Sequence, residues 1–197
     1  MLSAVFSSTP LAPKKRRWLW LFLFLIASVP RLVALNRYIT PDELIWVFRS
    51  VQFTEAMKVG EFGNTLVGGH PGVTTLWLAS AGIQLQTAVS PNAQAAYQWI
   101  TQLAYLTPDN NAAYQQLSQL LTGARLPLIL VNSLGLLLVA ALAARWRGRK
   151  TAVFLFLFLA LDPFLIGLSA ILHVDALLTT FATISLLALL VALEQWQ

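Results

Sequence analysis

The feature that most constrains the fold is an apolar run from residue 152 to residue 193. It is 42 residues long, whereas an α-helix needs only about 20 residues to cross a bilayer. The run therefore predicts two membrane-spanning helices folded back to back, with a turn near its midpoint. His173 and Asp175 stand at that midpoint. An aspartate at the centre of a span costs roughly 2.5–3.5 kcal/mol, and this cost disappears at the membrane surface, so length and charge both place the turn at residues 172–175.

The composition of the whole chain agrees with an integral membrane protein. Hydrophobic residues make up 57% of the sequence and charged residues 11%, whereas soluble domains carry about 25% charged residues. The sequence predicts an all-α integral membrane fold with four transmembrane helices, at residues 18–35, 122–144, 151–171 and 176–194. Asp162 and Pro163 predict a kink in the third of these, with Asp162 capping the part that follows. A basic cluster followed by an apolar segment is also typical of a cleaved signal peptide. Pro30–Arg31 stands where such a peptide would need small residues for cleavage, which favours an uncleaved first span.

Positive charge predicts the orientation of the chain. Eight of the 13 Lys and Arg residues lie in two clusters within residues 14–17 and 145–150, each next to an apolar run. Such clusters mark the cytoplasmic side of a membrane protein, which places the tail (residues 1–17) and the turn (residues 145–150) in the cytoplasm. The loop at residues 36–121 holds three basic residues and is predicted to be extracytoplasmic. Because both clusters flank spans, the net charge of +5 gives no reason to expect a nucleic-acid partner.

The outer loop is predicted to contain amphipathic helices that lie on the membrane surface. Apolar residues recur at helical spacing in four stretches, at residues 41–58, 73–85, 92–106 and a last one that ends near Leu121. The first stretch begins with a helix-start signal, because Thr40 suits the N-cap, Pro41 the first helical position and Glu43 the capping-box position. One interpretation is that Asp42 and Glu43 only start this helix.

Several titratable residues are predicted to meet at the outer surface. They come from three separate stretches of the chain and are Asp42, Glu43, His70, His173 and Asp175. Titratable groups that converge at a lipid–water boundary are typical of a functional site. Trp46 and Arg49 follow Asp42 along one side of the first amphipathic helix. That side is either a solvated face with a helical ion pair or an anion site beside a general base.

Other classes of chemistry are excluded or disfavoured. The sequence contains no cysteine, so disulfides and thiolate metal sites are impossible. It also lacks the P-loop, GxSxG, HExxH and GxGxxG motifs. Their absence argues against nucleotide hydrolysis, serine chemistry, zinc proteolysis and dinucleotide cofactors.

Three short patches resemble the lipid-linked-sugar glycosyltransferases of the GT-C superfamily, above all the protein O-mannosyltransferases and the aminoarabinose transferases of lipid A. Pro41–Glu43 is similar to the acidic motif of that family's first outer loop, and Gly69–Gly72 to a later motif of the same loop. Residues 162–175 are similar to the third patch, whose terminal Asp belongs to the second outer loop. The likeness covers residues 15–195 and implies the N-terminal part of a GT-C fold. Gly72 stands where mannosyltransferases usually have a second Pro, so a mannose donor is not implied.

The resemblance implies a transferase on the extracytoplasmic face. It moves a sugar from a polyprenyl phosphate carrier to an acceptor, which is a protein, a glycan or a lipid. Asp42 is then the catalytic base, with Glu43 and Asp175 as the other catalytic residues. Such a reaction needs a base for the acceptor hydroxyl or amine and positive groups for the leaving phosphate.

The remaining expected site residues bind ligands. Arg49 and Arg125 are expected to meet phosphate, and His173 to bind substrate. His70 is expected to contribute to a site for a divalent metal ion, the only cofactor that the sequence suggests.

Two alternatives of other classes stay open. One is a non-catalytic, truncated membrane subunit that docks on a full-length partner, and the expected partners include membrane lipids and the remainder of a longer polypeptide. The other is a fragment of a transporter. Transporters usually place ionisable groups at the bilayer midplane, whereas here they are predicted at one surface, which favours the enzyme.

Overall fold

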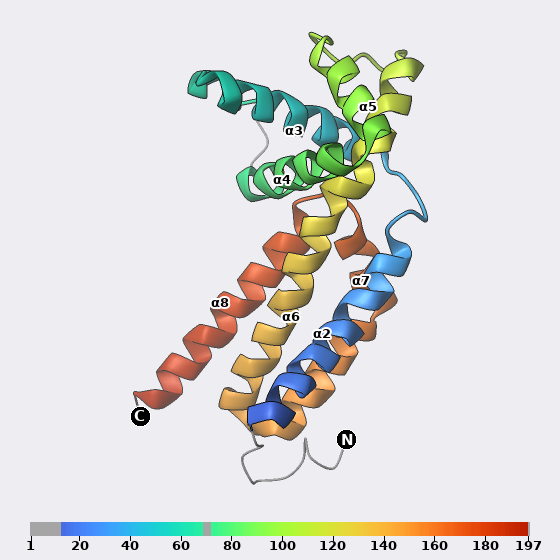
Figure 1. Cartoon of the computed structure of the whole chain (residues 1–197). Helices are drawn as coiled ribbons and strands as arrows, with labels where there is room; N and C mark the ends of the chain where they lie inside the picture. Colours follow the sequence, from blue (N-terminus) through green and yellow to red (C-terminus); the bar gives the residue numbers. More distant parts are fainter. Residues whose placement is uncertain (1–12, 69–71, 197) are drawn as a thin grey trace.

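The computed structural model describes residues 13–68 and 72–196, and the regular elements in them are all helical (Figure 1). The elements are α2 (Pro13–Ala34), α3 (Pro41–Val59), the short 3-10 helix η1 (Phe62–Thr65), α4 (Val73–Val89), α5 (Pro91–Thr101), α6 (Asn111–Leu161), α7 (Pro163–Ala170) and α8 (Asp175–Gln195). Three of them, α2, α6 and α8, contain stretches long and apolar enough to cross a membrane. The described residues confirm the predicted all-helical fold, and these three helices agree with a membrane protein.

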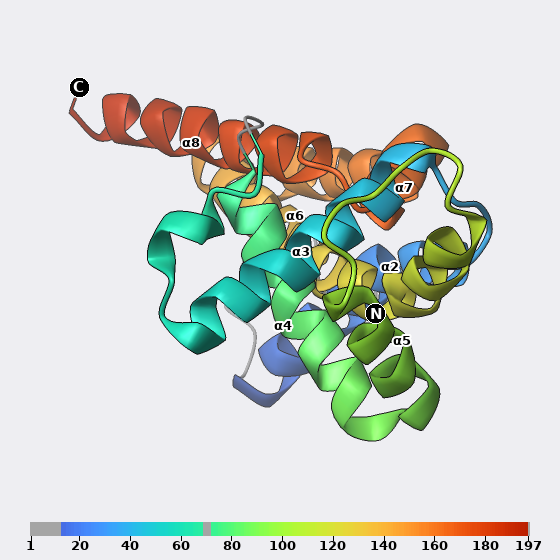
Figure 2. The same cartoon turned by 90° about the horizontal axis from the view of Figure 1, so that it is seen from above.

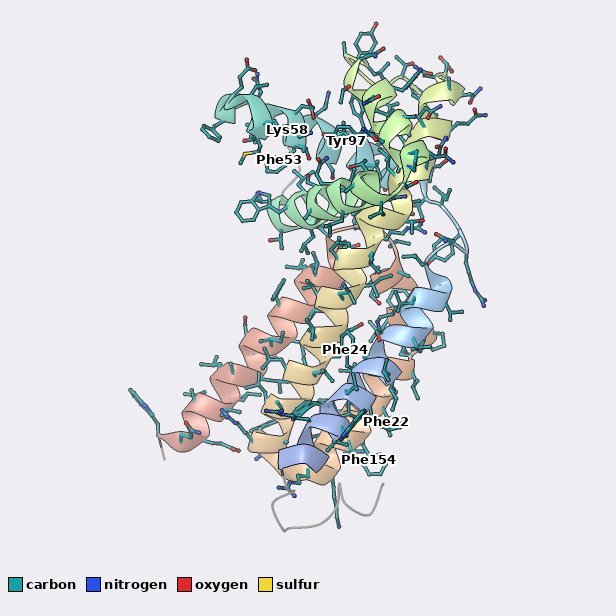
Figure 3. The ribbon with its side chains drawn as sticks, in the orientation of Figure 1. Phe22, Phe24, Phe53, Lys58, Tyr97 and Phe154 are labelled. Carbon is teal, nitrogen blue, oxygen red and sulfur yellow. The ribbon has the colours of Figure 1, made fainter. Side chains whose placement is uncertain are left out.

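The helices form two layers. In Figure 1, α2, α6 and α8 run along the long axis of the molecule, and α3, α4 and α5 lie across one end of it. Seen from above, α8 extends sideways beyond this outer layer (Figure 2). Aromatic side chains of the long helices face outward, such as Phe22 and Phe154, which are 46% and 72% exposed (Figure 3). Side chains of this kind suit contact with lipid tails.

Helix α6 contains both of the middle apolar segments in one 51-residue element. Its backbone leaves helical geometry at Gly148, where φ is 85° and ψ is 169°, a conformation that only glycine adopts without strain. Figure 1 shows the chain folding back at this end of the molecule, so that the second part of α6 runs beside α2. Gly148 falls within the basic turn expected at residues 145–150. Arg147 ties that turn to the end of α8 through an ion pair with Glu194 at 2.6 Å.

The start of α6 differs from the sequence-based expectation. A separate short helix ending near Leu121 was expected, but the helix continues from Asn111 into the apolar segment without a break. Pro127 lies inside it and cannot donate to the carbonyl of Gly123 four residues earlier. Gly82 of α4 packs against that carbonyl, so closely that a Cβ on Gly82 would collide with it. The part of α6 before Gly148 therefore joins the outer layer to the long helices as one continuous helix.

The outer layer has its own apolar core. Side chains from α3, α4, α5 and the start of α6 pack together, and among the fully buried ones are Val47, Ala79, Ile83, Ile100 and Leu117. A polar contact closes the layer near its surface, where Tyr97 donates to Glu55 at 2.6 Å beside Lys58 (Figure 3). Helix α5 ends at Thr101, five residues before the expected end at residue 106. Helix α3 therefore packs against the other helices of this layer.

Candidate functional site

The site begins at the first turn of α3, which starts at Pro41 as the helix-start signal predicts. The carboxylate of Glu43 accepts a hydrogen bond from the Thr40 N–H at 2.9 Å and another from the Thr40 hydroxyl at 3.1 Å. This is the glutamate half of a capping box, which satisfies a backbone donor that the helix leaves unpaired. Glu43 itself is fully buried. Its carboxylate therefore needs further partners to offset the loss of water.

Arg125 of α6 supplies those partners. Its Nε donates to Glu43 Oε1 and its Nη2 to Glu43 Oε2, both at 2.6 Å, in a two-pronged ion pair. The same guanidinium donates to the carbonyls of Leu35 and Tyr38, which lie between α2 and α3. The backbone N–H of Leu172, between α7 and α8, donates to Glu43 Oε1 at 2.7 Å. One buried carboxylate and one buried guanidinium thus hold four parts of the chain together.

The ion pair also sets the protonation of Glu43. Burial by itself raises the pKa of a carboxyl group, because it disfavours the charged form. Here the hydrogen bonds from Arg125, Leu172 and Thr40, together with the charge of Arg125, outweigh burial and lower the pKa of Glu43 below its ordinary value. Glu43 is therefore an ionised, fully occupied group that positions the start of α3.

Trp46, one turn further along α3, is the centre of a second cluster. Its ring meets the His173 ring edge-on, with centroids 6.4 Å apart, and the Arg49 guanidinium lies 5.4 Å from its centroid. Gly72, at the start of α4, lies so close to Trp46 and Val174 that a Cβ there would collide with the indole. The cluster therefore brings α3, the start of α4 and the segment between α7 and α8 to one place.

His173 and Asp175 form the polar end of this cluster. His173 Nδ1 lies 3.0 Å from Asp175 Oδ2, but the two groups are not aligned as a hydrogen bond. The contact is therefore an ion pair only when the imidazole carries a second proton. The side chains are 28% and 55% exposed, so both can be reached from outside.

Asp42 differs from its neighbour Glu43 in burial and in hydrogen bonding. Its side chain is exposed and forms no hydrogen bond or ion pair with the residues that the structure describes. The backbone that carries it is held by the Glu43–Arg125 pair and by the core beneath α3. Asp42 is therefore an exposed carboxylate on a packed helix start, one residue from a carboxylate that is bonded to the segment carrying His173 and Asp175.

The structure thus separates the expected site residues into groups. Arg49, His173 and Asp175 gather around Trp46, and Asp42 lies at the start of the same helix. The side chains of Glu43 and Arg125 bind each other, and His70 lies outside the described residues. Within the described part of the chain, no group of three His, Asp or Glu side chains is placed to hold a metal ion. The expected metal site depends on His70 and therefore stays a prediction.

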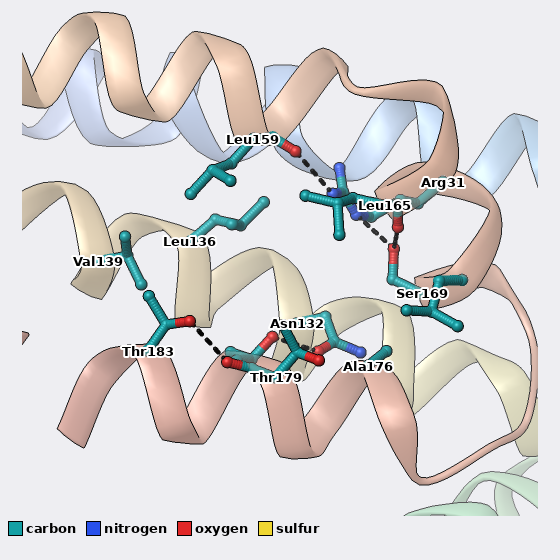
Figure 4. Close-up of a pocket in the computed structure, with 12 residues that line it drawn as sticks. Arg31, Asn132, Leu136, Val139, Leu159, Leu165, Ser169, Ala176, Thr179 and Thr183 are labelled. Atoms are coloured by element: carbon teal, nitrogen blue, oxygen red, sulfur yellow. Dashed lines mark hydrogen bonds between the residues drawn. The ribbon is translucent and has the colours of Figure 1, made fainter. Parts of the chain in front are cut away.

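Sequence reasoning missed a second polar centre, inside the long helices. Arg31 of α2, Asn132 of α6 and Ser169 of α7 are each at most 5% exposed, and all three line one cavity (Figure 4). A signal was present, because an arginine within a membrane-spanning stretch is costly and usually has a specific role.

Comparison with protein-family models, curated proteins and solved structures gives no match for this chain. Its function is therefore inferred from the side chains described above.

Proposed function

We propose that this chain carries the catalytic base of a membrane glycosyltransferase, which moves a sugar from a polyprenyl phosphate carrier to an acceptor on the extracytoplasmic face. One observation carries the proposal. Asp42 is an exposed carboxylate without a partner among the described residues, held on a helix start that a buried ion pair anchors. A general base needs this combination, because it must be free to take a proton and fixed in position.

The proposed reaction assigns a role to each group. Asp42 takes the proton of an acceptor hydroxyl or amine as that atom attacks the anomeric carbon of the sugar. The bond from that carbon to the carrier phosphate breaks, and the phosphate leaves with the bonding electrons. Arg49, held against Trp46, faces the negative charge that develops on the phosphate. His173 and Asp175 orient the acceptor or the sugar.

Glu43 and Arg125 act in this proposal by positioning other groups. The two carboxylate oxygens of Glu43 accept five hydrogen bonds between them, so Glu43 has no free position for an acceptor proton. Arg125 uses its guanidinium on Glu43 and two backbone carbonyls, so it is a weak candidate for phosphate binding. Their effect on transfer runs through the placement of Asp42 and of the segment at residues 171–174.

The proposal includes a topology with four spans. In this topology the two parts of α6, on either side of the backbone break at Gly148, each cross the membrane, with the basic turn in the cytoplasm and α3, α4 and α5 on the outer surface. The positive-inside rule supports this orientation. Because the chain has no cysteine, single cysteines at Gln94 and Lys150 can be labelled selectively. A membrane-impermeant thiol reagent should label the first from outside and leave the second unlabelled.

A second candidate function is a transporter fragment. Arg31 and Asn132, buried between the helices, support it, since transporters line their substrate sites with polar groups between packed helices. The two candidates differ in what Asp42 does, because a transporter of this kind does not need a carboxylate base at its outer surface.

The test measures the rate of sugar transfer by membranes that contain the native protein together with its natural partners. Asp42→Asn should lower the transfer rate by about 10²–10⁴-fold, the usual effect of losing a general base. Asp109→Asn is the matched control, since Asp109 is another exposed carboxylate of the outer layer, and it should leave the rate unchanged. Normal turnover by Asp42→Asn would remove the base and return Asp42 to a helix-start role.

A further inference from the structure

A small cavity lies between the long helices, below the outer layer. Side chains from α2, α6, α7 and α8 surround it (Figure 4). Its volume is about 50 Å³, enough for about four water-sized groups at ~10–15 Å³ each. The cavity therefore admits a small ion with a few water molecules, but neither a sugar nor a hydrocarbon chain. Its polar lining residues are Arg31, Asn132, Ser169, Thr179, Thr180 and Thr183.

Arg31 brings a positive charge to this cavity. Its side chain is 2% exposed, and no Asp or Glu of the described residues forms an ion pair with it. Asp162, at the start of α7, accepts a hydrogen bond from the Leu165 N–H at 2.8 Å instead. The guanidinium charge is therefore buried without a negative partner in contact with it, an arrangement that favours an anion nearby.

The hydrogen bonds of Arg31 all go to neutral oxygens and leave one nitrogen underused. Nε donates to the Ser169 hydroxyl at 2.8 Å, and Nη1 donates to the carbonyls of Ala27 and Ala160 at 2.7 and 3.1 Å. Nη2 makes only one long contact, 3.4 Å from the carbonyl of Leu159. Because a guanidinium has five N–H donors, at least one N–H of Nη2 is left for a further acceptor.

Asn132 supplies a second donor to the same cavity. Its Oδ1 accepts from the Thr180 hydroxyl at 2.8 Å, but its Nδ2 has no partner among the described residues. Asn132 is 2% exposed, and a buried donor without a partner is costly. Figure 4 shows Arg31 and Asn132 reaching the cavity from different helices. An acceptor placed between them would remove that cost.

The groups that lack a partner identify the kind of ligand. Both are donors, so a ligand that only accepts hydrogen bonds satisfies them. A water molecule would accept from them too, but its own O–H groups then need acceptors. A phosphate or sulfate ion presents four oxygens, more than these free donors can serve. A monatomic anion with a single charge also balances the one positive charge of Arg31. The apolar lining residues, which offer no acceptors, include Leu136, Val139, Leu159, Leu165 and Leu168.

The position of the cavity along α2 lowers the cost of placing an ion there. Arg31 lies three residues before Ala34, the end of α2 next to the outer layer, which is about 4.5 Å at 1.5 Å per residue. Burying charge costs less near the end of an apolar segment than at its centre.

We propose that this cavity binds one chloride ion, which accepts hydrogen bonds from Arg31 Nη2 and Asn132 Nδ2. The site is separate from the Trp46 cluster, and the proposal does not depend on sugar transfer. The ion neutralises the charge of Arg31 on α2 and gives Asn132 on α6 its missing partner. Since Thr180 on α8 donates to Asn132, chloride stabilises the packing of all three helices.

The test is a chloride titration of the purified full chain in a non-ionic detergent. The protein is first dialysed into sodium gluconate, whose anion is too large for the cavity, and the line width of the chlorine-35 NMR signal is then measured. Bound chloride that exchanges with free chloride broadens this signal. The broadening should saturate as one site per chain fills. Absence of a saturable component would show that the cavity holds water only and would overturn the proposal.

Arg31→Gln tests the charge. It should weaken chloride binding by at least about tenfold, the usual effect of losing a hydrogen bond to a charged group, so the saturable broadening should be lost. Arg37→Gln is the matched control, because it removes the same charge from an exposed side chain, and it should broaden the signal as the wild type does. Equal losses in both variants would place the chloride at the protein surface and overturn the cavity site.

Asn132→Asp tests the site without removing Arg31. The aspartate keeps an oxygen that accepts from Thr180 and puts a negative charge in the place of the ion. The saturable broadening should be lost, and the unfolding temperature should no longer rise with chloride as it does in the wild type. Asn92→Asp makes the same change at an exposed position on α5 and should behave like the wild type. Saturable broadening of wild-type size in folded Asn132→Asp would overturn the proposal, even if Arg31→Gln fails to fold.

Discussion

Two buried arginines occupy contrasting places in this molecule. Arg125 lies at the junction of the outer layer with the long helices, and Arg31 lies among the long helices, yet each side chain is 2% exposed. Both donate to backbone carbonyls of neighbouring segments. Arg125 also binds a fully buried carboxylate, whereas Arg31 has no carboxylate partner among the described residues.

This difference in partners determines how far the charge of each arginine is neutralised. The charge of Arg125 is neutralised by Glu43, so this pair is a joint between segments and offers little to a ligand. Arg31 keeps its charge uncompensated in a low-dielectric region, where an opposite charge is attracted most strongly. Arg125 therefore joins segments through a charge pair, whereas Arg31 joins them through hydrogen bonds to neutral oxygens alone.

The largest effect is expected from Glu43→Gln. This variant leaves Arg125 buried without a counter-charge, which typically costs about 3–5 kcal/mol of stability. Glu194→Gln breaks an ion pair of the same 2.6 Å length in which both side chains are largely exposed, and it should cost less than about 1 kcal/mol. Unfolding of the detergent-solubilised protein measures both, and equal losses would contradict the structural role of Glu43.

A smaller effect is expected from Arg31→Met. Here the charge itself is removed, so no uncompensated charge remains. The carbonyl of Ala160 loses a donor at 3.1 Å, whereas that of Leu159 loses only a long contact of 3.4 Å. An unsatisfied buried group costs about 1–3 kcal/mol. The same unfolding assay should therefore rank Arg31→Met between the wild type and Glu43→Gln. A loss of stability larger than that of Glu43→Gln would show that Arg31 contributes more to stability than the Glu43–Arg125 pair.

Lowering the pH should weaken the ion pair between Glu43 and Arg125 and leave the hydrogen bonds of Arg31 unchanged. The pKa of Glu43 is lowered in the folded protein, so its contribution to stability is present above the ordinary glutamate pKa of about 4.3 and is lost as pH falls through the lower folded value. The stability of Glu43→Gln should depend less on pH in that acidic range than the stability of the wild type. Parallel pH profiles would show that this carboxylate is not held ionised by Arg125.

The comparison also shows what the sequence could predict. The start of α3 at Pro41 and the Asp162 cap on the Leu165 N–H, at 2.8 Å, follow from local patterns of a few residues. The break between α7 and α8, at residues 171–174, lies where helix length and charge cost predict a turn. These features could be predicted because each depends on one continuous stretch of the sequence.

The partners of the buried charges could not be predicted in the same way. Glu43 and Arg125 are 82 positions apart, and Arg31 and Ser169 are 138 apart, so only the packed helices bring them together. The sequence predicted a catalytic role for Glu43 and phosphate binding for Arg125, and it could not show that each is the other's partner. The continuity of α6 through residue 121 was also missed, because the last stretch of the outer loop and the span that follows were treated as separate elements, whereas the structure joins them in one helix.

The central claim is that Asp42 and Asp175 serve one site, and a distance between them tests it most directly. The chain has no cysteine, so Asp42→Cys with Asp175→Cys introduces only two thiols. A cross-linker that spans about 15 Å, the widest separation at which both groups reach one substrate, should join them. Asp42→Cys with Gln195→Cys is the control, because Gln195 lies about 30 Å further along α8, and it should not be joined. Efficient cross-linking of the first pair alone is the result expected, and failure of that pair in a folded protein would contradict the shared site.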